Sequence, residues 1–398
     1  MVTENKKYIP ALRFPEFQND GEWKCVIIGD IISTINPPKK LQSSEYKKKG
    51  AFPIVDQSAS YIAGYSDNGD AVIDNNGYNY IVFGDHTCSL KLIDFPFIQG
   101  ADGIKIFKSK ITEVLTEYLY QYIFAHPINS KEYKRHFSDL KDKLLLYPTK
   151  ACEQKKIADC LSSLDKYIDA TKRKLELLKE HKKGLMQRLF PAKGKTTPEL
   201  RFPEFQNDGE WQIVSLGEIT SVVNRKNKSN RSLPIYSINN AEGFVPQSQQ
   251  FAGMDSEARG YDISAYKIIG KHTFAYNPAR INVGSIGYSG ELKDILISSL
   301  YVCFKTMDNV DDDFIMCFFN SYIFNQAVES NVEGGIRSYL FYENFSRINI
   351  AIPSLYEQKR IASCITSIED VIKQTNKQIC LLETHKNGLL QQLFPKIK

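Results

Sequence analysis

The sequence contains the same twelve residues twice, and this constrains the fold more than any other feature. The segment LRFPEFQNDGEW occupies residues 12–23 and again residues 200–211. A second pair of similar stretches, Glu153–Pro191 and Glu357–Pro395, opens with EQKKIA or EQKRIA and closes in LFP. Self-similarity of this kind indicates a duplicated architecture. The chain is therefore predicted to contain two copies of one structural plan, although the residues between the repeated segments differ almost completely.

The two similar stretches carry apolar residues at an alternating spacing of four and three, which is typical of a heptad seam. The first seam comprises Ile157, Leu161, Leu164, Ile168, Leu175, Leu178, Leu185 and Leu189. The second comprises Ile361, Ile365, Ile368, Ile372, Ile379, Leu382, Leu389 and Leu393. Thr171 and Lys182 interrupt the first seam, and Thr375 and Lys386 interrupt the second at the same places. Each stretch is predicted to be one helix of roughly 57 Å, at about 1.5 Å per residue, ended by a proline.

An apolar seam of this length must be covered, and the matching seam lies on the other copy. We therefore expect the two helices to form an antiparallel coiled coil. The first helix delivers the chain to the second variable region and the second helix starts where that region ends, so the second must run back. This direction would bring Lys398 close to the first variable region. The alternative is that each helix packs on its own domain or on another chain.

The regions between the repeats show the same order of elements with different letters. Residues 24–148 contain the β-like runs FPIVD, AVID, YNYIVFG and GIKIFK, then the helix VLTEYLYQYIFA and the run LLLYP. Residues 212–353 contain PIYSI, FAYN, ILISSLYVCFK, the helix FIMCFFNSYIF and INIAIP. The predicted fold class is α/β (mixed α+β), with two globular domains of sheet and helix joined by the two long helices in a pseudo-two-fold internal repeat. The expected boundaries are 1–150 for the first domain, 151–192 for the first helix, 193–199 for a linker, 200–353 for the second domain and 354–398 for the second helix.

Length, composition and charge narrow the class of protein. The 398 residues are 42% hydrophobic, which is enough for more than one core. No apolar run approaches the roughly twenty residues that span a bilayer, and the start MVTENKKYIP is too polar for a signal peptide, so we expect a cytoplasmic protein without membrane contact. The eight cysteines contain no CxxC pair, which disfavours a zinc or disulfide framework.

The formal charge of +5 is concentrated in the two helical stretches. Residues 150–195 hold 13 Lys and Arg against 6 Asp and Glu, whereas residues 1–149 hold 18 of each sign and residues 196–352 are acidic. A chain balanced like this would need local patches or a partner to hold DNA firmly.

Basic and polar residues nevertheless gather at equivalent places in the two variable regions. The basic groups, which are candidate phosphate contacts, follow Asn36 and Asn224 and comprise Lys39, Lys40, Lys47, Lys48, Lys49, Arg225, Lys226, Lys228 and Arg231. Side-chain types that read base edges occur in GDHTCSLK and NPARINVG, as His86, Thr87, Ser89, Lys91, Asn277, Arg280 and Asn282. Solvated loops carry similar basic clusters, and the polar residues could equally stabilise tight loops.

Motifs that would indicate an enzyme are incomplete. Asn36-Pro37-Pro38 lacks the aromatic residue and the glycine-rich loop of an adenine methyltransferase. Gly194-Lys195-Thr196 has the tail of a phosphate-binding loop, but Leu189 stands where the first glycine belongs. Glu153-x-Lys155 falls in a first helical turn, and at the second copy Ser354 and Glu357 are expected to form a capping box.

The whole arrangement resembles the specificity (S) subunit of Type I restriction-modification enzymes. The resemblance is carried by two variable domains, each followed by a long helix that opens with EQK[KR]IA and closes in LFP, and by GDHTCSLKLIDFPFIQGADGIKIFK and NPARINVGSIG, which are similar to segments of that family's target recognition domains. It implies a chain without an active site, in which each domain reads half of a split double-stranded DNA site. The helices would then set the spacer, which is the number of unread base pairs between the two half-sites. They would also dock methylation (M) subunits, through which restriction (R) subunits join.

The resemblance also implies which cofactors belong elsewhere. This chain would bind no cofactor or metal, and S-adenosylmethionine, ATP and magnesium are expected on the partner subunits. The assembled complex would methylate adenine and cleave DNA. A self-standing sequence-specific DNA-binding regulator is the main alternative, and the balanced charge argues against it. A purely structural coiled-coil protein would not need two diverged domains rich in Asn, Arg and Tyr.

Overall fold

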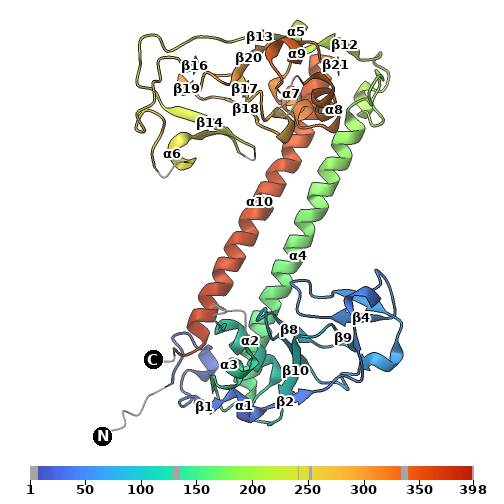
Figure 1. Cartoon of the computed structure of the whole chain (residues 1–398), viewed down its shortest axis with the longest axis vertical. Coiled ribbons are helices and arrows are strands. Elements are labelled where there is room, and N and C mark those ends of the chain that lie inside the picture. Colours follow the sequence, from blue (N-terminus) through green and yellow to red (C-terminus); the bar gives the residue numbers. More distant parts are fainter. Residues whose placement is uncertain (1–7, 129–134, 241, 251–252, 333–338, 397–398) are drawn as a thin grey trace. The chain divides into compact units, whose positions relative to one another are not determined.

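A computed structural model describes residues 8–128, 135–240, 242–250, 253–332 and 339–396 (Figure 1). The chain splits into two compact units. The first comprises Met1–Arg173 with Lys377–Lys398, and the second comprises Lys174–Asn376. Each unit therefore contains one globular domain and a segment of each long helix. The mixed fold class predicted from the sequence is confirmed.

The described part of the first domain contains two larger sheets and one two-stranded sheet. The four-stranded antiparallel sheet has the order β2-β10-β7-β8, from β2 (Ile32–Ile35), β7 (Tyr80–Gly84), β8 (Leu90–Ile93) and β10 (Ile104–Ser109). The second sheet consists of β3 (Lys40–Leu41), β4 (Phe52–Val55), β5 (Gly64–Ser66), β6 (Val72–Ile73) and β9 (Phe97–Gly100). The pair β1 (Lys24–Ile27) and β11 (Leu144–Tyr147) and the helices α1 (Ile28–Ile31), α2 (Thr116–Ala125) and α3 (Phe137–Lys141) complete the domain.

Strand β7 explains how these layers are held together. Successive side chains of a strand point to opposite faces. Ile81 and Phe83 pack into the cluster that contains Tyr118 of α2, whereas Val82 packs with Val55 of the second sheet. All five residues of β7 are buried because both faces of the strand are covered.

The second domain repeats this plan. Its four-stranded sheet has the order β13-β20-β17-β18, from β13 (Thr220–Val222), β17 (Phe274–Tyr276), β18 (Ile286–Tyr288) and β20 (Val302–Thr306). The other sheet consists of β14 (Ile235–Asn239), β15 (Gly243–Pro246), β16 (Lys267–Ile269) and β19 (Ile295–Ile297). The remaining elements are β12 (Gln212–Ser215), β21 (Asn349–Ile352), α5 (Leu216–Ile219), α6 (Gln247–Gln250), α7 (Asp312–Phe319), α8 (Tyr322–Asn331) and α9 (Tyr342–Ser346).

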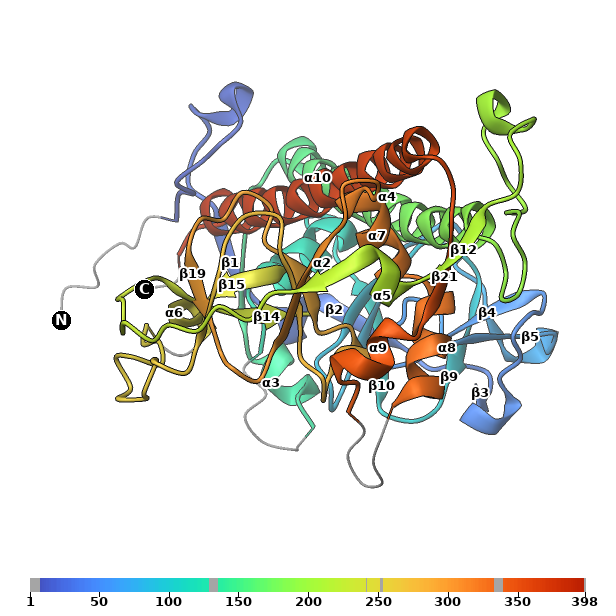
Figure 2. The same cartoon turned by 90° about the horizontal axis from the view of Figure 1, so that it is seen from above.

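The layers of the second domain follow the same alternation. Phe274 and Tyr276 of β17 pack into the cluster with α7, α8 and α9, whereas Ala275 packs with Ile238 of β14. In both views β14 and α6 accordingly lie on the side of the domain away from these helices (Figures 1 and 2). The equivalent strand pairs β4·β9 and β14·β19 are both parallel. The two domains therefore share topology although their sequences differ.

Two predicted segments of the second domain are broken where the sequence suggested one element. ILISSLYVCFK forms the two strands β19 and β20, because a turn follows Ile297 and the amide of Tyr301 donates to the carbonyl of Ser298 at 3.1 Å. FIMCFFNSYIF contains the end of α7 and the start of α8. The break occurs because Ser321 acts as an N-cap, with its hydroxyl accepting from the amide of Phe324 at 3.2 Å.

The two long helices, α4 (Ala151–Leu189) and α10 (Leu355–Leu393), are present as predicted. Every predicted seam residue is buried or half-buried, and so are the four interrupting residues. The lysines of the seam are paired across the helices: Lys182 with Glu369 at 2.5 Å in the second unit, and Lys386 with Asp165 in the first. A charge on the seam therefore always has a partner on the facing helix.

These pairs also define the direction of packing within each unit. In the first unit Asp165 contacts Lys386 and Lys172 contacts Glu383. The residue numbers therefore rise along α4 as those of its partners fall along α10. In the second unit Lys182 contacts Glu369, while Leu189 packs in one cluster with Ile361. The helix segments are therefore antiparallel within each unit. Knobs-into-holes packing of a coiled coil stays a prediction.

The end of each long helix enters a domain core. Phe394, beyond the end of α10, packs in the core of the first domain, and Phe190, beyond the end of α4, packs in the core of the second. The amide of Leu12 donates to the carbonyl of Gln392 at 2.9 Å, and the amide of Leu200 donates to that of Arg188 at 2.9 Å. The C-terminal helix end thus belongs to the first unit, whereas Lys398 lies outside the described residues.

Candidate nucleic-acid interface

The repeated segments attach each domain to its helix through matching ion pairs. Arg13 donates to both carboxylate oxygens of Glu153 at 2.7 and 2.8 Å, and Arg201 donates to those of Glu357 at 2.8 Å each. The Arg13 side chain is 7% exposed and that of Glu153 is 1% exposed. The neighbouring carboxylate raises the pKa of both guanidinium groups, mainly through these hydrogen bonds. Bidentate geometry of this kind fixes orientation as well as charge.

The glutamine that follows each glutamate anchors the domain at a second point. Gln154 accepts from the amide of Leu115, at the N-terminus of α2, and donates to the carbonyls of Glu113 and Pro148. Gln358 accepts from the amide of Asp311, at the N-terminus of α7, and donates to the carbonyls of Asn309 and Pro353. The repeated EQ motif is therefore structural.

This corrects the expected capping box. The hydroxyl of Ser354 does accept from the amide of Glu357 at 3.4 Å, but the Glu357 carboxylate binds Arg201. The ion pair with arginine stabilises a buried carboxylate more than a hydrogen bond from the backbone amide of the N-cap residue would. Glu153 is engaged in the same way by Arg13, which leaves no free carboxylate at Glu153-x-Lys155.

Three segments of the first domain meet at the edge of its sheets, and we call residues 56–60, 84–89 and 101–103 the first loop cluster. The hydroxyls of Thr87 and Ser89 each donate to the carbonyl of Gln57 at 3.1 Å. The amide of Asp85 donates to the carbonyl of Gly103 at 2.7 Å. The predicted segment GDHTCSLK therefore forms the β7–β8 hairpin loop, with half-buried His86 on it.

The corresponding segments of the second domain are residues 237–240, 277–285 and 298–301, which we call the second loop cluster. The side-chain amide of Asn240 donates to the carbonyl of Val283 at 2.8 Å. The predicted segment NPARINVG forms the β17–β18 loop, the equivalent of the β7–β8 loop in the first domain. Sequence reasoning selected these two segments separately, and the topology shows that they are structural counterparts.

A polar cleft of about 390 Å³ lies at the second loop cluster. Asn277 and Arg280 line it together with Gln250, Arg259 and Tyr301, and no carboxylate is present among its lining residues. Burial raises the pKa of Tyr301, and the nearby charge of Arg280 opposes that shift. Asn282 is exposed on the same loop.

Sequence reasoning missed Gln57 and Tyr301 of the loop clusters and Arg259 of the cleft. No local motif marks them, since they reach these places only through strand pairing and a long excursion of the chain. The backbone carbonyl of Gln57 accepts the hydrogen bonds from the hydroxyls of Thr87 and Ser89. Its side-chain oxygen is buried without a hydrogen-bond partner among the described residues. Arg259 lies over the ring of Tyr261 at 5.2 Å.

The predicted basic residues lie on exposed loops of their own domains. In the first domain Lys39, Lys40, Lys47, Lys48 and Lys49 are all exposed. Lys40 pairs with Asp102 at 2.8 Å, and Lys47 pairs with Asp67 at 2.9 Å. Exposed pairs contribute little to stability, so these lysines could exchange an aspartate for a phosphate at small cost.

The basic residues of the second domain are exposed as well, and comprise Arg225, Lys226, Lys228 and Arg231. The side chain of Arg231 lies 3.4 Å from that of Asp294. The backbone of Lys226 forms an isolated antiparallel β-bridge with that of Lys267 in β16. The basic groups and the loop clusters thus remain candidate DNA contacts.

Lys91 is different from the other candidates. It is 5% exposed, and its ammonium group donates to the carbonyls of Asp56 at 2.7 Å and Ser60 at 2.5 Å. Burial lowers the pKa of Lys91. Because its charge is used to hold the first loop cluster together, we do not retain it as a DNA contact.

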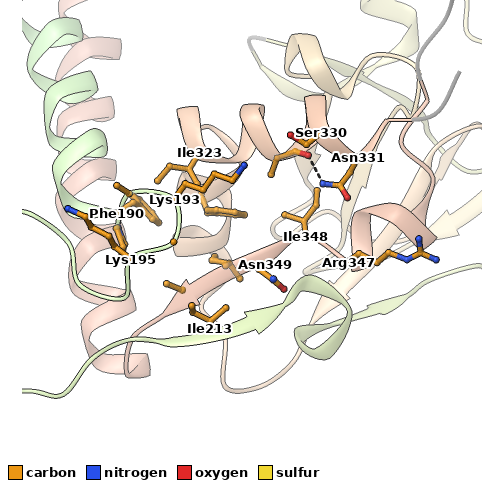
Figure 3. Close-up of a pocket in the computed structure, with 17 residues that line it drawn as sticks. Phe190, Lys193, Lys195, Ile213, Ile323, Ser330, Asn331, Arg347, Ile348 and Asn349 are labelled. Atoms are coloured by element: carbon orange, nitrogen blue, oxygen red, sulfur yellow. Dashed lines mark hydrogen bonds between the residues drawn. The ribbon is translucent and has the colours of Figure 1, made fainter. Parts of the chain in front are cut away.

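The linker after α4 borders a separate cavity of about 370 Å³ (Figure 3). Phe190, Ile213, Ile323 and Ile348 supply apolar walls, while Lys193, Lys195 and Arg347 contribute charge. The hydroxyl of Thr196 donates to Glu210 at 2.8 Å, so Gly194-Lys195-Thr196 is a linker turn here.

Among the residues that the structure describes, no group of three or more His, Cys, Asp or Glu side chains could hold a metal ion. In the same part of the chain, no helix combines the length and apolarity needed to cross a bilayer.

Comparison with known proteins places this architecture in a family. The model of the type I restriction modification DNA specificity domain matches residues 20–180 and 208–383. The type I restriction enzyme MjaVIII specificity subunit of Methanocaldococcus jannaschii is 23% identical over 437 residues, covering 98% of this chain and 95% of that protein. A candidate type I restriction enzyme specificity subunit of the same organism, MjaX, is 26% identical over 256 residues, which span 61% of this chain and 56% of that relative.

A solved structure shows the same fold over the full length. The Type-I restriction-modification system S subunit from M. genitalium superposes with a TM-score of 0.66 at 16% identity, covering 98% of this chain and 100% of that one. The two family-model matches each span one of the duplicated halves. This chain therefore belongs to the type I restriction modification DNA specificity domain family.

Proposed function

We propose that this chain is the non-catalytic sequence-recognition subunit of a Type I restriction-modification complex. Each domain reads one half of a bipartite double-stranded DNA site, and the helices set the spacer and dock the methylation subunits. Restriction subunits join through the methylation subunits, which bind S-adenosylmethionine, while ATP and magnesium belong to the partners. The complex thereby directs adenine methylation and restriction.

One observation carries the proposal. The residues that attach each domain to its helix are matched, as in Arg13–Glu153 and Arg201–Glu357, whereas the two loop clusters have unrelated side chains on equivalent strands. A duplicated scaffold with divergent loops is what reading two different sequences requires. Polar side chains on anchored loops can read base edges, and exposed lysines beside them can hold phosphates.

Exposed apolar side chains on the long helices support a docking role. Tyr167 and Leu177 of α4 are 51% and 65% exposed, and Val371 and Leu381 of α10 are 40% and 61% exposed. The Tyr167 hydroxyl accepts from the side-chain amide of Gln378 of α10 at 2.7 Å, so this exposed ring lies beside the facing helix. The four exposed residues form equivalent positions, since the second helix follows the first at an offset of 204 residues. Large apolar side chains held in water at matched places favour a protein partner.

The direct test is to co-express the chain with the methylation subunit of the same strain and to map adenine methylation by single-molecule sequencing. We expect a split motif with a fixed gap. A complex that assembles and folds but methylates no split motif would contradict the proposal. If the chain without partner subunits bound DNA with the same affinity as the assembled complex, the self-standing regulator would be favoured instead.

Shortening both helices by one heptad should shorten the spacer between the half-sites. Deleting residues 168–174 and 372–378 together preserves both seams and removes roughly 10 Å from each helix. At about 3.4 Å per base pair, we expect a spacer about three base pairs shorter and unchanged half-sites, measured by the same methylation map. Deleting one heptad alone should mismatch the seams and abolish methylation. An unchanged spacer after the paired deletion would rule out the ruler role.

Charging the exposed helix positions should weaken docking. We expect Leu177→Asp with Leu381→Asp to reduce affinity for the methylation subunit about tenfold or more, because apolar contact is lost and a charge is desolvated. Calorimetric titration of the folded chain would measure it. Ser163→Asp with Thr366→Asp, which adds the same two charges at exposed polar positions of α4 and α10, serves as the control. Equal affinities for all three chains would place the docking surface elsewhere.

A further inference from the structure

The β17–β18 loop holds Arg280 in a defined position. Arg280 is the N-cap of the short 3-10 turn Ile281–Val283. Its amide donates to the carbonyl of Asn277 at 3.0 Å, and its own carbonyl accepts from the amide of Ser285 at 3.1 Å. The backbone of the residue is therefore fixed on both sides.

The same loop is tied to two other parts of the domain. The carbonyl of Pro278 accepts from the amide of Leu340 at 3.1 Å, next to α9. The side chain of Asn240, after β14, donates to the carbonyl of Val283 at 2.8 Å. A loop anchored from two neighbouring segments presents its exposed side chains without a large ordering cost on binding.

The guanidinium group of Arg280 is not used by the fold. Within the described ranges it has no hydrogen bond and no ion pair, and Arg280 is exposed at the cleft. Three other arginines of the unit are engaged by carboxylates: Arg231 by Asp294, Arg347 by Glu343, and Arg201 by Glu357. With no carboxylate among the residues that line the cleft, nothing there competes for the guanidinium.

The side chain of Asn277 holds the loop that carries Arg280 and is not a second group for contacting a base. Its side-chain oxygen accepts from the amide of Ala279 at 3.0 Å, which closes the turn just before Arg280. Bidentate recognition of adenine needs both the oxygen and the nitrogen of an amide. Asn277 is thus a positioning residue, and Arg280 is the free donor.

We propose that Arg280 reads a guanine in the half-site of the second domain, by donating two hydrogen bonds to its O6 and N7 atoms. Planar, bidentate donation is the geometry in which arginine distinguishes guanine from the other bases. The inference rests on the proposed function, and it assigns a chemical preference to one loop of that function.

The test compares methylation complexes that carry Arg280→Ala, Arg280→Lys or Arg347→Ala. Each is incubated with a library of duplexes in which the second half-site found for the wild-type complex is randomised one position at a time. We expect both Arg280 variants to lose discrimination at one guanine by about 5- to 150-fold, with the first half-site unchanged. Arg347→Ala removes an exposed, ion-paired arginine of the same domain and should keep the wild-type preference.

A chemical change on the DNA provides the second measurement. Replacing that guanine by 7-deazaguanine removes the N7 acceptor, and we expect it to weaken wild-type methylation but to have little further effect on Arg280→Ala. Uniform loss at every position of the half-site, or an unaltered preference in both variants, would overturn the assignment to Arg280. Failure of the proposed function is distinct, because the wild-type complex would then yield no half-site to randomise.

Discussion

Replacing Phe394 with alanine should destabilise the first unit by about 3–5 kcal/mol, although this residue follows the second long helix. Phe394 is 2% exposed and lies against Tyr118, Tyr122 and His126 of the first domain, with ring centroids 5.9, 5.5 and 5.9 Å away. The substitution would leave a cavity among large aromatic rings that cannot collapse easily. Peptide-resolved hydrogen exchange should show faster exchange of the backbone amides of residues 116–125, which form α2.

Phe190→Ala is the matched control, because Phe190 occupies the equivalent place in the second unit. It lies 5.3 Å from Phe314 and 6.5 Å from Trp211 between ring centroids. Its loss should accelerate exchange in 312–331 and leave 116–125 unchanged. If Phe394→Ala instead loosened 312–331, the assignment of the C-terminal helix end to the first unit would be wrong.

Replacing Glu153 with alanine should cost about 3–5 kcal/mol, which is far more than an exposed ion pair would. The Arg13 guanidinium would lose its carboxylate while it remained buried beside the carbonyls of Asp20 and Gly21. Denaturant unfolding, followed by a probe in each unit, would measure the loss. Glu357→Ala should affect the second unit by a similar amount, since Arg201 makes the equivalent contacts to Asp208 and Gly209.

A double-mutant cycle separates the ion pair from the loss of a side chain. Arg13→Met together with Glu153→Ala should be less destabilising than the sum of the single changes, because no uncompensated charge remains. A loss below about 1 kcal/mol for Glu153→Ala would mean that the pair behaves like a surface salt bridge and that the repeated LRFPEF segment is held mainly by packing.

The long helices could be predicted because their signals are local and long. Nine heptad-spaced intervals and a terminal proline describe α4 within a few residues, and the chain order already required antiparallel segments. Some strands of both domains, such as β4, β7, β14 and β17, were also visible as short apolar runs, whereas others, such as β2, β8 and β18, were not predicted. The breaks at 298–301 and 320–321 were not predicted either, because a serine turn and a serine N-cap interrupt runs that are otherwise mostly apolar.

The candidate site was predictable only in part. Thr87, Ser89 and Arg280 were selected by residue type, and they lie on equivalent loops. Lys91 was selected in the same way, yet its ammonium group is turned inward to two carbonyls. Residue type states which chemistry a side chain can perform, whereas its direction depends on the strand that carries it.

The sequence by itself determined the duplication, the two helices and their direction, since repeats, periodicity and chain order are properties of contiguous residues. Only the tertiary structure decided what the repeats are for and which loops meet. Arg13 and Glu153 are 140 residues apart, and Gln57 reaches the β7–β8 loop because the two sheets pack on each other through residues such as Val55 and Val82. Contacts of this kind depend on how sheets and helices pack, and no local pattern in the chain records them.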